Sequence, residues 1–128
     1  MSVIGIGADL VELDRFRVAL ERTPSIVERL FTPAERAYAE RRRDPVERFA
    51  ARFAAKEAVL KALGVGIGGM AFREIEVVRA RSGEPAVVLH GAVSDLAAER
   101  GVRRWLLTLT HTERVAQAIA VALGEEHR

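Results

Sequence analysis

The apolar positions of this chain follow two periods, and the alternation between them predicts an α+β fold. Some segments repeat apolar residues at helical spacing, whereas others show the alternation or the short apolar runs typical of strands. The expected elements, in chain order, are a strand over 2–8, a helix over 12–21, a single turn over 25–28, helices over 32–43 and 46–63, strands over 73–80 and 86–90, a helix over 92–100, and strands over 104–110 and 115–123. This order predicts a mainly antiparallel sheet packed against helices.

Local signals mark the ends of two helices. Thr32-Pro33-Ala34-Glu35 has the form of a capping box with proline at the first helical position, and Asp44-Pro45-Val46-Glu47 repeats that form. Gly64 can end the helix over 46–63 in a left-handed conformation. The glycines that follow resemble a phosphate-binding loop only superficially, because such loops precede a helix. Their bare backbone could still line a ligand pocket.

The last strand, from Val115 to Leu123, is apolar on both faces. Burial on both sides is typical of a central strand whose two faces are covered, and it is also typical of a subunit interface. The pattern leaves both interpretations open.

One acidic residue stands out in the helix over 46–63. Glu57 falls in phase with the apolar positions that should face the core, such as Ala50 and Leu60. An ionised carboxylate there costs roughly several kcal/mol unless a cation, a metal or hydrogen bonds compensate it. The alternative is a surface pair between Glu57 and Lys61, worth about 0.3–0.5 kcal/mol. Lys56 and Lys61 are the only lysines of the chain, and both lie in this helix.

Asp9 lies where we expect the first strand to give way to a turn. Taken alone, it is best interpreted as the N-cap of the following helix. Together with Glu57 it has a second interpretation, because two carboxylates with open positions left for water and phosphate oxygens are how proteins hold Mg²⁺.

Length and composition exclude several classes of protein. The chain has 128 residues, 49% of them apolar, which suits one folded domain over 1–128 and excludes a mainly disordered chain. It has no cysteine, hence no disulfides and no thiolate metal site. No signal peptide or membrane-spanning run is evident. We therefore expect a cytoplasmic protein without a membrane partner.

The distribution of charge along the chain bears on the kind of partner. The net charge is only +2, but arginines concentrate around Arg15 to Arg22 and in the run Arg41-Arg42-Arg43. Such runs are commonly solvated faces, and they also suit an acidic partner or a phosphorylated ligand. No nucleic-acid motif accompanies them, so we expect no nucleic acid. The histidines lack zinc spacing, and His111, at the end of its strand, is more often structural than catalytic at such a place.

Four segments together resemble the small bacterial holo-acyl-carrier-protein synthases, a branch of the 4′-phosphopantetheinyl transferases. They are Gly5-Ile6-Gly7-Ala8-Asp9-Leu10-Val11-Glu12-Leu13-Asp14-Arg15, Phe31-Thr32-Pro33-Ala34-Glu35, the stretch from Arg52 to Gly64, and Thr108-Leu109-Thr110-His111-Thr112. Their order and the chain length fit over nearly the whole sequence, and the first and third segments are specific motifs.

The resemblance implies a reaction and a metal. It implies transfer of 4′-phosphopantetheine from coenzyme A to a serine of apo-acyl carrier protein, with release of adenosine 3′,5′-bisphosphate. It matches Asp9 and Glu57 to the family's Mg²⁺ carboxylates and Lys61 to its phosphate-contacting lysine. The serine proton could pass to a metal-bound water or to Glu57, and the sequence leaves both open.

The resemblance also implies binding surfaces and an assembly. The family forms a homotrimer with coenzyme A sites between subunits, which would explain the apolar last strand. Candidates for the adenine and 3′-phosphate end of coenzyme A are Arg41, Arg42, Arg43, Arg52 and His111. Candidates for the wall of the coenzyme site are Gly64, Gly66 and Pro85. On the first helix, Arg15 and Arg22 would dock the acidic carrier protein.

The sequence departs from the family pattern at two positions, and two other functions are to be weighed against the transferase. Val65 and Thr108 stand where the family commonly has threonine and serine. A non-enzymatic trimeric module that binds acidic proteins would have no need for Glu57, and a nucleotide-binding regulator would retain coenzyme A without transferring anything. The sequence leaves open whether the acceptor serves fatty-acid or polyketide synthesis.

Overall fold

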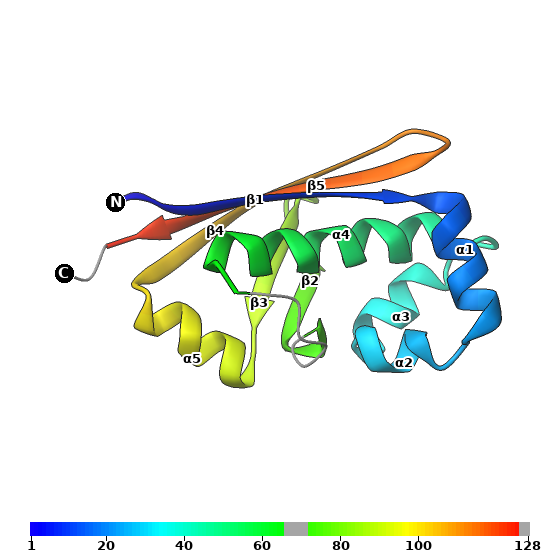
Figure 1. Cartoon of the computed structure of the whole chain (residues 1–128), viewed down its shortest axis with the longest axis horizontal. Coiled ribbons are helices and arrows are strands. Elements are labelled where there is room, and N and C mark those ends of the chain that lie inside the picture. Colours follow the sequence, from blue (N-terminus) through cyan, green and yellow to red (C-terminus); the bar gives the residue numbers. More distant parts are fainter. Residues whose placement is uncertain (66–71, 126–128) are drawn as a thin grey trace.

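One long helix lies along a three-stranded sheet, and the rest of the chain packs around this pair (Figure 1). The computed structural model describes residues 1–65 and 72–125. The helices are α1 (Leu13–Arg22), α2 (Ile26–Leu30), α3 (Pro33–Ala39), α4 (Val46–Leu63) and α5 (Gly91–Glu99), with a short 3₁₀ turn η1 (Phe72–Glu74). The strands are β1 (Ser2–Glu12), β2 (Ile75–Arg79), β3 (Pro85–Leu89), β4 (Val102–His111) and β5 (Val115–Gly124). Within the described ranges, no helix is both long enough and apolar enough to cross a membrane.

All strand pairs are antiparallel, as the sequence predicts. The larger sheet has the order β1-β5-β4, and β2 pairs with β3 in a separate hairpin. The last strand is central in its sheet, because β5 lies between β1 and β4, but only its face toward α4 is covered: Ile119, on the other face, is 36% exposed in the single chain. The predicted α+β class with antiparallel pairing is therefore correct.

Three sequence-based expectations are wrong in detail. The first strand continues to Glu12, because its pairing with β5 extends to Val115. Asp9 consequently lies inside β1, opposite Ala118, and is not a helix cap. The helix expected to reach Arg43 ends at Ala39, where the backbone continues in turns.

The caps follow the sequence at two of three places. Thr32 and Glu35 form the reciprocal capping box, and Gly64 ends α4 in the left-handed conformation. The second capping box does not form. Pro45 is the N-cap of α4, and Asp44 accepts a hydrogen bond from the backbone N–H of Val46 (3.2 Å).

Small residues let α4 approach the sheet closely. Gly5 and Gly7 face α4, and a Cβ atom on either would overlap a carbonyl oxygen of that helix, that of Ala62 or of Ala58. The neighbouring strand β5 presents only small buried side chains to the helix. They are Ala116, Ala118, Ala120 and Ala122. The backbones of β1 and α4 are therefore almost in contact, which only glycine permits.

The opposite side of α4 carries a buried ion pair. Lys56 and Glu35 are 0% and 1% exposed, and the Lys56 Nζ donates to Glu35 Oε1 at 2.8 Å. The same ammonium donates to the carbonyl oxygens of Phe72 (2.7 Å) and Ile75, and Glu35 also accepts from the N–H of Val77 (2.9 Å). This network ties α4 to α3, η1 and β2.

The expectation that Glu57 faces the core is wrong. Glu57 is partly exposed and lies on the least buried stripe of α4, together with Phe53 and Lys61. The buried charged residues of α4 are Lys56 and Arg52. Because α4 is covered by the sheet on one side and by α3 and β2 on another, its apolar periodicity does not identify a single buried face.

The two lysines of α4 offer a matched test of this burial. Replacing Lys56 by methionine leaves Glu35 buried without its cation, so the free energy of unfolding should fall by about 3 kcal/mol. Replacing Lys61, which is 47% exposed, by methionine should change the free energy of unfolding by less than about 1 kcal/mol. Urea unfolding monitored by circular dichroism measures both values, and equal losses would contradict the structural role of Lys56.

Candidate functional site

Asp9 and Glu57 line the same hollow, although they lie 48 positions apart in the sequence. Asp9 comes from β1 and Glu57 from α4, and the hollow has a volume of about 470 Å³. Its other lining residues come from β1, α1, α2 and α4. They are Leu10, Val11, Glu12, Arg15, Phe16, Ala19, Leu20, Ile26, Leu30 and Phe53. The close contact of β1 with α4 thus places two carboxylates at the rim of a largely apolar hollow.

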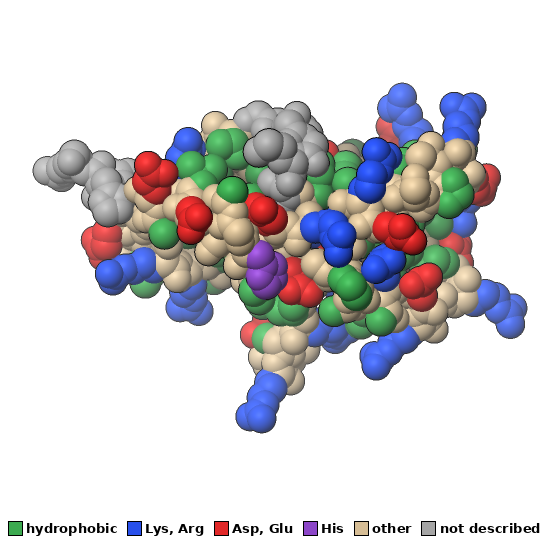
Figure 2. All heavy atoms as spheres, turned by 90° about the horizontal axis from the view of Figure 1, so that it is seen from below, with side chains coloured by type: hydrophobic (Ala, Val, Ile, Leu, Met, Phe, Trp, Pro, Cys, Tyr) green, Lys and Arg blue, Asp and Glu red, His purple; other side chains and the backbone are tan. Residues whose placement is uncertain are grey.

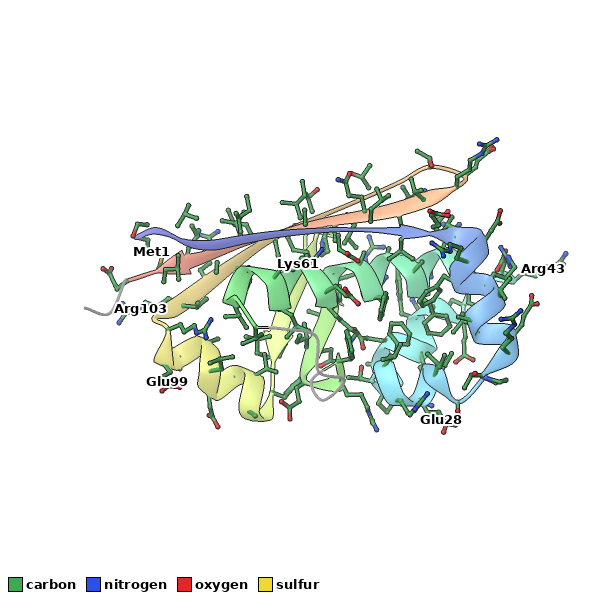
Figure 3. The ribbon with its side chains drawn as sticks, in the orientation of Figure 1. Met1, Glu28, Arg43, Lys61, Glu99 and Arg103 are labelled. Carbon is green, nitrogen blue, oxygen red and sulfur yellow. The ribbon has the colours of Figure 1, made fainter. Side chains whose placement is uncertain are left out.

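Lys61 completes this group of charged side chains. Its Nζ donates to Asp9 Oδ1 at 3.1 Å and to the carbonyl oxygen of Ala8 at 2.9 Å. Figure 3 labels Lys61, which projects from α4 beside β1. The surface pair between Glu57 and Lys61, given above as the alternative, is not among the ion pairs of the described residues; Lys61 pairs with Asp9 instead.

The electrostatics of the hollow favour an added cation. Burial raises the pKa of the Glu57 carboxyl group, the Asp9 carboxylate raises it further, and Lys61 partly opposes both. A second carboxylate close enough to raise the proton affinity of Glu57 also helps to attract a divalent metal ion. No third acidic, histidine or cysteine side chain of the described ranges joins them in a metal-binding group. A cation held here would therefore keep positions open for water or phosphate oxygens.

The predicted coenzyme residue Arg52 lies elsewhere. It lines a second hollow of about 270 Å³, between α3, α4 and β2. This hollow shares no lining residue with the first. Pro85, another predicted coenzyme residue, pairs in the β2–β3 hairpin with Arg79, which lines the second hollow.

The remaining predicted residues are spread over the surface. Arg15 and Arg22 lie on α1 and share a shallow depression with Val18. Arg42 and Arg43 are exposed after α3, and Figure 3 places Arg43 at the end of the molecule beyond α1, away from Lys61.

Of the other predicted coenzyme residues, the structure describes His111 and Gly64. His111 ends β4, and its Nδ1 lies 3.3 Å from the Glu47 carboxylate. Gly64 caps α4 one turn beyond Lys61. Gly66 lies outside the described residues.

Comparison with known proteins decides the family. Residues 5–120 match the family model described as the 4′-phosphopantetheinyl transferase superfamily. The chain belongs to this superfamily. The resemblance carried by the four sequence motifs is therefore confirmed.

Curated relatives within the superfamily match almost end to end. A holo-[acyl-carrier-protein] synthase of Desulforudis audaxviator is 47% identical over 123 residues, which cover 95% of this chain and 94% of the relative. One from Clavibacter sepedonicus is 48% identical over 121 residues, covering 94% and 96%.

Solved structures of the superfamily share the fold. The crystal structure of holo-[acyl-carrier-protein] synthase from Neisseria meningitidis superposes with a TM-score of 0.87 at 34% identity, covering 95% of this chain and 99% of that one. A Chronobacterium ammoniagenes complex of this synthase with coenzyme A gives 0.86 at 31% identity, covering 98% and 100%.

Sequence reasoning missed several residues that shape the two hollows. Gly5 and Gly7, which allow β1 to contact α4, were visible as two glycines at strand spacing. The pairing of Lys56 with Glu35 joins residues 21 apart and left no local signal. Tyr38 and Arg79, which flank Arg52 in the second hollow, also come from separate elements.

The raised pKa of Glu57 predicts a pH-dependent effect of Glu57→Gln. Because the folded pKa lies above the unfolded one, the protonated carboxyl group stabilises the fold at low pH, and this contribution is lost as pH rises through the folded pKa. In metal-free protein, Glu57→Gln should therefore be more stable than the natural chain at pH 8.

The difference in free energy of unfolding between Glu57→Gln and the natural chain should shrink as the pH is lowered to about 4, near the usual pKa of glutamate. Urea unfolding at several pH values measures it, with Glu99→Gln on the exposed end of α5 as control. A difference that grows on acidification would contradict the electrostatic description of this site.

Proposed function

We propose that this chain is a holo-[acyl-carrier-protein] synthase, a single domain over residues 1–128 that acts in the cytoplasm. It transfers 4′-phosphopantetheine from coenzyme A to a serine of apo-acyl carrier protein, requires Mg²⁺, and releases adenosine 3′,5′-bisphosphate. The observation that carries the proposal is that Asp9 and Glu57 line one hollow and that Lys61 donates a hydrogen bond to Asp9, in a chain about 47% identical to named synthases over most of its length.

The donor atoms of the hollow fit a magnesium ion. Asp9 and Glu57 offer carboxylate oxygens, the ligands that Mg²⁺ prefers, and the mutual repulsion of the two groups is relieved by a cation. These two residues would hold the ion. When bound, Mg²⁺ would neutralise charge on the phosphates of coenzyme A and so stabilise the transition state.

The chain's own residues then orient the reactants. The serine hydroxyl gives its proton to Glu57 or to a water, and its oxygen forms a bond to the phosphorus that bears the pantetheine arm. The bond from that phosphorus to the bridging oxygen breaks, and adenosine 3′,5′-bisphosphate leaves. Lys61, whose side chain is 47% exposed, can donate to a phosphate oxygen from its place beside Asp9. The apolar walls formed by Phe16, Leu20 and Phe53 suit the uncharged pantetheine arm.

The separation of the two hollows supports a site shared between subunits. Arg52 and Pro85 lie near the second hollow, away from Asp9 and Glu57. If these arginine-lined walls bind the adenine and 3′-phosphate end, a neighbouring chain has to supply them. We propose that His111, Arg42, Arg43, Gly64 and Gly66 belong to the same composite coenzyme site.

An exposed apolar face offers the surface for the proposed homotrimer. The side of the β1-β5-β4 sheet that points away from α4 carries large apolar residues that are exposed in the single chain. They are Val3, Ile6, Leu10, Leu106 and Ile119, with Ile6 66% exposed. Contiguous apolar surface of this kind marks protein–protein interfaces.

The α1 surface suits the acidic carrier protein. Arg15 lines both the catalytic hollow and the neighbouring depression, and Arg22 lines the depression alone. A carrier protein docked by complementary charge on these arginines would present its serine beside Asp9 and Glu57.

Mass spectrometry of apo-carrier protein incubated with the protein, coenzyme A and Mg²⁺ tests the proposal. A phosphopantetheine mass shift should appear with the natural chain and should require the metal. Glu57→Gln should slow transfer by roughly a thousandfold, because several kcal/mol of charge stabilisation are lost.

The control for this assay is Glu99→Gln, which should transfer at the normal rate. Absence of a shift with several carrier proteins, using folded protein, would refute the transferase. Transfer by Glu57→Gln at the normal rate would instead refute the role of that carboxylate.

Sedimentation velocity tests the proposed trimer. The natural chain should sediment as a trimer at micromolar concentration, whereas Ile6→Glu should dissociate it, because a charge placed on an apolar interface is costly to bury. Val88→Glu, on the separate hairpin, is the control and should leave assembly intact. A monomeric natural chain would contradict the assembly.

A further inference from the structure

The guanidinium of Arg52 is buried, and it forms no ion pair with the residues that the structure describes. Arg52 is 5% exposed, and its Nε is buried with no hydrogen-bond partner among the described residues. Burial lowers the pKa of this side chain, while the charges of Tyr38 and Glu35 oppose the shift. Glu35 is itself occupied by Lys56. A cation in such a place is costly unless an anion is supplied.

Tyr38 is the residue that holds Arg52 in place. The Arg52 guanidinium lies 4.2 Å from the centre of the Tyr38 ring, and that of Arg48 lies 4.0 Å from it. The Tyr38 hydroxyl accepts a hydrogen bond from Arg79 Nη1 at 2.7 Å. Burial alone would raise the pKa of Tyr38, but the Arg79 hydrogen bond and the surrounding arginines lower it. One aromatic side chain thus positions arginines from α4 and β2.

Arg52 and Arg79 line the second hollow, together with Arg41. The other lining residues are Ala34, Tyr38, Val77 and Val78, and no acidic side chain of the described residues lines it. On the face turned away from the three-stranded sheet, by contrast, basic side chains are interspersed with acidic ones (Figure 2). An excess of guanidinium groups over carboxylates at one hollow indicates an anionic ligand.

The chemistry of the lining favours a phosphate monoester. Guanidinium groups recognise phosphate oxygens through paired hydrogen bonds, and two groups held side by side match a dianion better than a single negative charge. Coenzyme A carries such a monoester at its 3′ position, in addition to the diphosphate that would lie at Asp9 and Glu57.

We propose that Tyr38 is a positioning residue that holds Arg52 and Arg79 at the second hollow, where Arg79 joins Arg52 in binding the 3′-phosphate of coenzyme A. The identity of this phosphate rests on the proposed function. The Tyr38 ring contacts the guanidinium group of Arg52, and the Tyr38 hydroxyl group accepts a hydrogen bond from that of Arg79. Tyr38 therefore sets the distance between the two groups. The pocket therefore selects coenzyme A over its 3′-dephospho form.

Steady-state kinetics with coenzyme A and with 3′-dephospho-coenzyme A test the proposal. Arg79→Gln and Tyr38→Leu should each raise KM for coenzyme A about tenfold, the effect of one lost charge-assisted hydrogen bond. The value of kcat should stay within about twofold, and KM for the dephospho form should not change. Tyr38→Phe keeps the ring and loses only the hydroxyl group, so its effect should be about threefold.

The control is Arg103→Gln, an exposed arginine on β4 that lines neither hollow. It should change neither KM. Equal changes for both coenzymes would show a general structural effect and overturn the proposal, as would unchanged discrimination in Arg79→Gln. Circular dichroism melting verifies that each variant is folded.

A binding measurement separates failure of this inference from failure of the proposed function. Calorimetry compares adenosine 3′,5′-bisphosphate with adenosine 5′-phosphate and inorganic phosphate, whether or not the protein transfers anything. The natural chain should prefer the bisphosphate, and Arg79→Gln should lose that preference. Equal affinity for the two nucleotides in the natural chain, or binding of inorganic phosphate as tight as that of the bisphosphate, would overturn the assignment of the pocket.

Discussion

The contact between β1 and α4 is the constraint on which the rest of the structure depends. Gly5 and Gly7 bring the strand so close to the helix that no Cβ atom fits between them. Two residues beyond Gly7, on the same face of β1, Asp9 meets Lys61 of α4, and Glu57 lines the hollow beside it. A wider separation of helix and sheet would leave the two carboxylates apart. The proposed catalytic group is thus a consequence of small residues in the core.

The charged residues of α4 divide into two sets with different tasks. Lys56 and Arg52 point into the protein, where the first neutralises Glu35 and the second meets Tyr38. Glu57 and Lys61 lie on the least buried stripe of the helix, beside β1. The ion pair between Lys56 and Glu35 ties α4 to α3 and β2. It thereby fixes the rotation of α4 about its own axis, which keeps Glu57 and Lys61 beside β1. One helix therefore connects the carboxylate hollow to the arginine-lined hollow.

Local signals in the sequence predicted the order of the elements, the Thr32 capping box and the end of α4 at Gly64, because these depend on neighbouring residues. The motifs around Asp9 and Glu57 also predicted the family. The extent of β1 and the true orientation of Glu57 could not be predicted, since both depend on pairing and packing between distant segments. For the same reason the sequence did not indicate that Arg52 lies apart from the carboxylates, or that Tyr38 positions it.

The central claim is that Asp9 and Glu57 act together on one divalent ion. Electron paramagnetic resonance of Mn²⁺, titrated into the natural chain, Asp9→Asn, Glu57→Gln and the double variant, tests it most directly. If both carboxylates bind one ion, there should be a single class of site per chain. Either substitution should weaken it about a hundredfold, with little further loss in the double variant, because both ligands serve the same ion. Unchanged Mn²⁺ affinity in Asp9→Asn or Glu57→Gln, or losses that simply add in the double variant, would contradict it.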